Sequence, residues 1–169
     1  MSRKILVIVL VLAMGALTTA CAKTIAEKVI ENQTGGKVKV NSGKGSVEIK
    51  GKGGTLKVGE NTLPADFPKD VPVYKPNTVK SSMSNIVEGK KSFVVILTTK
   101  ADVDAVADFY KKGLTGNGWT EKSALTGGEG GTRFATLGYE KGGAMVTVTI
   151  TRANNDKETQ MMISFNPKT

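Results

Sequence analysis

The sequence predicts an α+β protein. We expect an antiparallel sheet in the order β-β-α-β-β-β-β with one helix packed on it, preceded by a short helix and a small three-stranded β-meander. Three observations predict this. Residues 37–58 repeat a short alternating apolar pattern, residues 103–114 carry apolar side chains at helical spacing, and the residues after 119 alternate in strand fashion between glycine-containing turns.

Residues 1–20 are typical of a cleavable export signal. Arg3 and Lys4 precede an apolar run of 13 residues, Ile5–Leu17, and small residues then lead to Cys21. The run is shorter than the ~20 residues that a membrane-spanning helix needs. The alternative is an ordinary secretory signal cut before Ala22 or later, and the lone cysteine at the boundary disfavours it, because exported proteins seldom carry one unpaired cysteine. The position of the cysteine therefore favours a different kind of signal.

The segment that ends in Leu17-Thr18-Thr19-Ala20-Cys21 resembles the lipobox of bacterial lipoproteins. The leucine stands four places before the cysteine, whereas a large aliphatic residue is commoner three places before. The resemblance implies cleavage before Cys21 and a diacylglyceryl group on its sulfur, and two acyl chains anchor a protein stably. We expect an exported protein tethered through Cys21 to the outer membrane of a Gram-negative cell, or otherwise to the outer face of the cell membrane.

Composition excludes several kinds of chemistry. The chain has no histidine and a single cysteine, so histidine-dependent catalysis, histidine metal sites and disulfides are excluded. Loss of Arg3 and Lys4 with the signal lowers the net charge from +9 to +7. The remaining cations are nearly all lysine, which lacks the planar fork that reads nucleic acids. We expect no enzymatic activity, no metal, no cofactor and no nucleic-acid partner.

Residues 21–62 are expected to form a lipidated N-terminal unit. Ile25, Val29 and Ile30 lie near one face of a possible helix over 22–34, although thirteen residues are marginal for a helix in water and a frayed stalk is the alternative. Three apolar pairs then recur every nine residues, which predicts the meander. Its other side carries an expected anion-contacting set: Lys37, Lys39, Lys44, Lys50, Lys52 and Lys57.

Two interpretations of these lysines stay open. Lysines protect exposed sheet edges and keep a protein soluble. Held near a membrane, they would also be attracted to anionic groups, by ~1 kcal/mol for each lysine. The apolar face of the meander must be covered by the preceding helix or by the following domain.

Residues 63–76 are expected to be a linker, because proline recurs every fourth residue and favours an extended, semi-rigid run. LPADFPKDVPVY in this region and DFYKKGLTGNGW further on resemble a set of small, largely uncharacterised bacterial exported lipoproteins. The resemblance covers roughly residues 60–165. It implies a compact domain behind a Pro-rich lead-in, and no activity or site residues come with it.

Residues 77–169 are expected to form the main α+β domain. Phe93–Leu97 is an unbroken apolar run that suits a strand buried on both faces. Thr99-Lys100-Ala101-Asp102 is close to a capping box, and a helix follows. Four strands complete the domain after Gly118. The helix is expected to bury one set of side chains, which is Val103, Val106, Ala107, Tyr110 and Leu114.

Other groups in this domain have ordinary structural interpretations. Asp102 and Asp104 suit the positive end of the helix better than a metal site, since hard cations need several converging oxygens. Asp66 and Asp70 are expected to be solvated loop charges. Gly127–Gly131 lacks the ending of a phosphate loop and suits a hairpin connection.

Aromatic residues leave one further possibility. Trp119, Tyr110 and Tyr139 would form a stacking platform for sugars if they were exposed together, but a tryptophan directly after a helix is more often a core residue.

These expectations lead to one leading function. We expect a lipid-anchored cell-envelope protein with a non-catalytic binding or structural role and an envelope protein or polymer as its partner. The alternative is a sensor of polyanions, anionic lipid or a small ligand that binds through the lysines of the meander.

Overall fold

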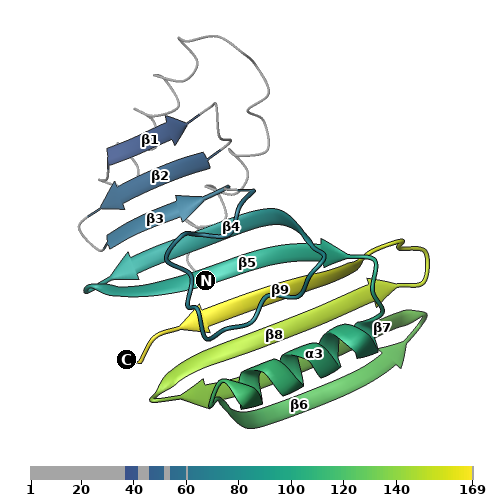
Figure 1. The fold of residues 1–169 in the computed structure, drawn as a ribbon. Coiled ribbons are helices and arrows are strands. Elements are labelled where there is room, and N and C mark those ends of the chain that lie inside the picture. The colour runs from purple at the N-terminus through teal and green to yellow at the C-terminus, as the bar shows by residue number, and fades with distance from the viewer. Residues whose placement is uncertain (1–36, 42–45, 52–53, 60, 169) are drawn as a thin grey trace.

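The structure is a computed structural model that describes residues 37–41, 46–51, 54–59 and 61–168. Within these residues the chain forms nine strands and one helix (Figure 1). The elements are β1 Lys37–Asn41, β2 Ser46–Gly51, β3 Gly54–Val58, β4 Thr78–Val87, β5 Lys90–Thr99, α3 Val103–Gly116, β6 Thr120–Glu129, β7 Thr132–Lys141, β8 Ala144–Ala153 and β9 Thr159–Asn166.

The nine strands form one antiparallel sheet with the order β1-β2-β3-β4-β5-β9-β8-β7-β6 (Figure 1). Strands β1 to β5 follow one another as a meander, and so do β6 to β9. The pairing of β5 with β9 joins the two halves. The chain leaves β5 in the middle of the sheet, passes through α3 and enters β6 at the far edge, so α3 carries it across one face.

The predicted fold class is wrong. It separated a small meander from an α+β domain, whereas β3 pairs with β4 in a continuous register from Thr55↔Ile86 to Val58↔Met83. The result is a single, mostly antiparallel sheet with one described helix. Periodicity shows which side chains share a face of a strand, but it does not show which strand edges will pair. Two unpaired edges each present backbone N–H and C=O groups, and pairing satisfies both. The expected helix over residues 22–34 and the signal over 1–20 lie outside the described residues.

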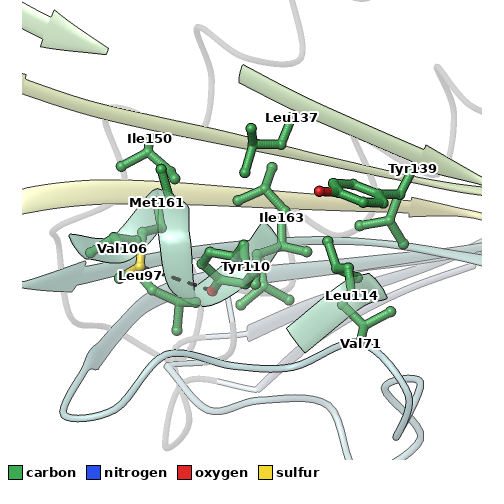
Figure 2. Packing of buried hydrophobic residues seen from close by; sticks show 14 of the residues in the cluster. Val71, Leu97, Val106, Tyr110, Leu114, Leu137, Tyr139, Ile150, Met161 and Ile163 are labelled. Carbon is green, nitrogen blue, oxygen red and sulfur yellow. Dashed lines mark hydrogen bonds between the residues drawn. The ribbon is translucent and has the colours of Figure 1, made fainter. Parts of the chain in front are cut away.

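Helix α3 packs over β6, β7 and β8 and buries the five side chains expected of it. The predicted capping box is absent: Asp102 is the N-cap residue, but its side chain makes no capping hydrogen bond. Its carboxylate instead accepts a hydrogen bond from Arg152 at 2.9 Å. In the core, the hydroxyl of Tyr110 points at the sulfur of Met161 on β9, 4.0 Å away (Figure 2).

The Pro-rich segment, residues 61–76, also lies on this face, where it crosses β4 and β5 (Figure 1). Its proline spacing builds two successive turns, in which Phe67 N–H donates to the Pro64 carbonyl at 3.0 Å and Val71 N–H donates to Pro68 at 3.2 Å. The four-residue spacing directs Phe67 and Val71 inward, and both are buried in the core. Residues 63–76 were expected as a linker, but they form part of the layer that covers the sheet.

We call the face that carries α3 and residues 61–76 the helix face, and the opposite side the open face. Strand β5 shows the difference between them. Phe93, Val95 and Leu97 point to the helix face and are buried, whereas Val94 and Ile96 point the other way and are only partly buried. The expectation that this strand is buried on both faces is therefore wrong.

Candidate functional site

Four exposed lysines lie together on the helix face. Lys57 of β3 is opposite Ser84 of β4, and Ser84 is opposite the core residue Phe93 of β5, so all three point to the same side. The registers of β2 and β1 carry this alignment outward. We call the resulting set the lysine surface: Lys37, Lys39, Lys50 and Lys57. Lys44 and Lys52, which were expected to join it, and Cys21 lie outside the described residues.

A single acid lies among these lysines in the described strands. Glu48 of β2 is 3.0 Å from Lys50 and 3.7 Å from Lys57. The hydrogen bond from Lys50 holds the pKa of Glu48 below its usual range, and the charges of Lys50, Lys57 and Lys39 act in the same direction. No ion pair to a described residue involves Lys37 or Lys39. The lysine surface therefore keeps a positive excess.

The apolar side chains of the meander were expected to be covered by the preceding helix or by the following domain. The following domain does not cover them, and the expected helix over residues 22–34 lies outside the described residues. Leu56 and Val58 lie opposite Asn85 and Met83 of β4 and share the open face with them. The following strands continue the sheet in the same plane and leave this face uncovered by other described elements. Met83, Val87, Met145 and Met162 are exposed there.

A shallow pocket of about 250 Å³ lies where the lysine surface meets the Pro-rich segment. Its floor comes from β4, where Ser82 and Ser84 are buried. Its walls come from β3, β5 and the turn at Pro64. The lining residues are Lys57, Pro64, Ala65, Asp66, Ser82, Ser84 and Lys91.

Lys91 and Asp66 form an ion pair at the rim of this pocket. The Lys91 ammonium also lies 5.2 Å from the centre of the Phe93 ring, which favours a cation there. The hydrogen bond from Lys91 holds the pKa of Asp66 below its usual range, and the charges of Lys91 and Lys57 add to the effect. The position occupied by the Asp66 carboxylate is therefore one where the protein stabilises an anion.

The other acidic groups singled out from the sequence form ion pairs that connect elements. Asp104 accepts from Arg133 at 2.7 Å and Asp102 from Arg152, which ties the start of α3 to β7 and β8. Asp70 pairs with Lys141 at 2.8 Å. Within the described residues, no three acidic or cysteine side chains converge to hold a metal ion.

The aromatic residues do not form an exposed platform. Trp119 is buried, and its indole N–H donates to the Asp70 carbonyl at 3.2 Å. Tyr110 and Tyr139 are buried as well. Gly127–Gly131 lies in the β6–β7 hairpin, as expected.

Comparison with known proteins gives one finding. Residues 79–161, which run from β4 to β9, match a family model described as START domain-like. The observed fold fits that description, and the match indicates a binding role for this part of the chain. No curated protein and no solved structure is significantly similar to the chain. The match supports the expected uncharacterised domain family, while the lipobox and the bacterial origin stay predictions.

Sequence reasoning missed the pocket. Its one local signal is that Ser82 and Ser84 fall at alternating positions of β4, where a core-facing strand would normally carry apolar side chains. The two residues that complete it, Asp66 and Lys91, are 25 residues apart in the sequence.

No helix in the part of the chain that the structure describes is long and apolar enough to cross a membrane.

Proposed function

We propose that this chain is a lipid-anchored, non-catalytic binding protein of the bacterial cell envelope, and that its lysine surface contacts anionic lipid headgroups. The observation that carries the proposal is the gathering of four exposed lysines from three adjacent strands on one face, with Glu48 as the one acid described among them. Each lysine close to an anionic bilayer contributes ~1 kcal/mol of attraction, which salt weakens.

The proposed tether supports this assignment. Cys21 precedes the first lysine, Lys37, by 16 residues. A chain of that length reaches at most about 55 Å at ~3.5 Å per residue. The acyl chains would therefore keep the lysine surface near the membrane at a high effective concentration, so that weak individual contacts suffice.

The tether has its own test. Cells that express the protein are labelled with palmitate, and the native chain is compared with the Cys21→Ser variant. We expect label on the native protein and none on the variant. Equal labelling of the two, or an uncut leader on the purified native protein, would show that the anchor is not at Cys21.

The binding surface is tested without the anchor. The mature chain 21–169 carrying Cys21→Ser is sedimented with vesicles of phosphatidylglycerol and phosphatidylcholine at low and high salt. We expect Lys37→Gln combined with Lys39→Gln to weaken binding at low salt by roughly tenfold or more. The matched control, Lys111→Gln with Lys112→Gln on α3, removes the same charge and is expected to change binding less than about twofold. Equal losses in the two variants would contradict a local surface.

A further inference from the structure

The floor of the pocket presents a hydroxyl group to the pocket volume. Ser84 is 6% exposed and is one of the residues that line the pocket. Polar groups in largely buried positions normally make hydrogen bonds. A polar ligand in the pocket would accept a hydrogen bond from this hydroxyl.

Two lysines flank this hydroxyl from neighbouring strands. Lys57 of β3 lies opposite Ser84 of β4. On the other side, Phe93 of β5 lies opposite Ser84, and Lys91 stands two positions before Phe93 on the same face of that strand. Lys57 is held only loosely by Glu48, at 3.7 Å, because Glu48 lies closer to Lys50. Lys91 is held by Asp66, whose side chain is 57% exposed and lies on a turn rather than in a strand. The pocket thus has two cations and one hydroxyl group directed at the same volume.

We infer that this pocket binds a phosphate group esterified to a small alcohol, with Lys57, Lys91 and Ser84 as its donors. Asp66 occupies the anion position on Lys91 until the phosphate displaces it. The inference deepens the proposed function, on which it rests, by naming the chemical group that the lysine surface would recognise.

The size and chemistry of the pocket suit this ligand. A volume of about 250 Å³ corresponds to roughly eight waters at ~30 Å³ each, enough for a phosphate with a glycerol-sized group attached. A phosphate ester presents several strong acceptor oxygens, which match the two ammonium groups and the hydroxyl. Lysine binds phosphate as a point charge and does not need the bidentate geometry of arginine.

The experiment follows the backbone amide NMR signals of the mature chain 21–169 with Cys21→Ser during titration with glycerol 3-phosphate and, separately, inorganic phosphate. We expect saturable shifts centred on Ser82–Ser84, Lys91 and Asp66. Shifts spread evenly over the lysine surface, or none near Ser84, would overturn the inference. Trp119 fluorescence and urea unfolding of every variant verify that each one is folded.

Three variants separate the pocket from general positive charge. Ser84→Ala is expected to weaken glycerol 3-phosphate binding about fivefold, and Lys91→Met at least about tenfold. Asp66→Asn is expected to strengthen binding by about threefold or more, because it removes the competing carboxylate. The control is Lys112→Gln on α3, which lies outside both the pocket and the lysine surface and is expected to stay within about twofold. Weaker binding by Asp66→Asn, or equal losses in Lys112→Gln and Lys91→Met, would contradict the inference.

The source of the phosphate is decided by competition. If glycerol 3-phosphate displaces the protein from phosphatidylglycerol vesicles and Ser84→Ala weakens vesicle binding, the ligand is a lipid headgroup. If the titration succeeds while the protein does not bind vesicles, the pocket stands with a soluble phosphate ester and the proposed membrane contact is wrong. If vesicle binding depends on Lys37 and Lys39 while Ser84→Ala and glycerol 3-phosphate leave it unchanged and the titration fails, the proposed function stands and the pocket is wrong.

Discussion

Tyr139 shows how one buried residue can control the response of the protein to pH. It lies on β7 in the core (Figure 2). Its hydroxyl donates to the Glu121 carboxylate of β6 at 2.9 Å. Burial raises its pKa to about 12, and the hydrogen bond to Glu121 and the negative charge of that residue add to the rise. Tyr110 on α3 also has a pKa raised to about 12, and there burial is the main cause.

The sign of the resulting pH dependence follows from linkage. An unfolded tyrosine loses its proton near pH ~10. Since the folded pKa of each of the two tyrosines is higher, their contribution to the free energy of unfolding is fully present below pH ~10. It is lost as the pH rises towards 12.

We predict that Glu121→Gln lowers the pKa of Tyr139 but leaves it above ~10, because burial remains. The pKa of Tyr110 is expected to stay at about 12, since the main cause of its rise is burial. Ultraviolet absorbance of the phenolate, followed against pH, measures both. Glu140→Gln is the control, because Glu140 pairs with Lys122 at 3.1 Å. An unchanged Tyr139 titration in Glu121→Gln would show that the hydrogen bond has no influence on it.

At the scale of elements, the contact between α3 and the Pro-rich segment is the least expected feature of the fold. The two meet at Gly113, where an added Cβ atom would lie 2.9 Å from Cγ of Pro72. That is closer than van der Waals contact, and a proline ring has little freedom to move away. A glycine in the middle of a helix costs about 1 kcal/mol relative to alanine. Its presence here is explained by the crossing proline.

We predict that Gly113→Ala lowers the free energy of unfolding by about 1 kcal/mol, since overpacking costs about 1–3 kcal/mol and outweighs the gain in helix propensity. Urea unfolding measures the change. Gly116→Ala is the control: no atom lies within 4 Å of its added Cβ, so it is expected to be neutral or slightly stabilising. Combined with Pro72→Ala, the Gly113→Ala change should cost less than it does alone. If Gly113→Ala stabilised the protein, the tight contact would be refuted.

At the scale of the whole molecule, the covering layer and the sheet differ in extent. Helix α3 and the buried part of residues 61–76 cover the helix face from β4 to β6, where the core residues lie. No described side chain of β1, β2 or β3 is buried. These three strands depend on their backbone ladder and on their pairing with β4. Stability should therefore decrease along the sheet from β8 to β1.

We predict that amides of β1–β3 exchange with solvent deuterium well before those of β5, β8 and β9, because local opening costs less where little apolar surface is buried. Native-state hydrogen exchange followed by mass spectrometry would show this gradient. Adding glycerol 3-phosphate should slow exchange in β3 and β4 selectively if the pocket is occupied. Uniform protection across the sheet would contradict an edge that opens independently.

Much of the local structure could be predicted from the sequence. The spacing of Val103, Val106, Ala107, Tyr110 and Leu114 identified the helix and its buried face, because side chains three and four apart share one side of a helix. Alternation and glycine turns identified the strands, including the three of the meander. The same alternation placed the four lysines of the described strands on one face together.

Other features were decided only by the tertiary structure. The pairing of β3 with β4 joins two strand edges, and the sequence pattern carries no information about edges because backbone groups are the same at every residue. The burial of Phe67 depends on a sheet surface that forms from strands distant in sequence. The pocket depends on both events, since Lys57 reaches Ser84 through the β3–β4 pairing and Asp66 reaches Lys91 through the docking of the Pro-rich segment. The sequence by itself thus determined the faces of the elements, whereas long-range packing determined which faces and edges meet.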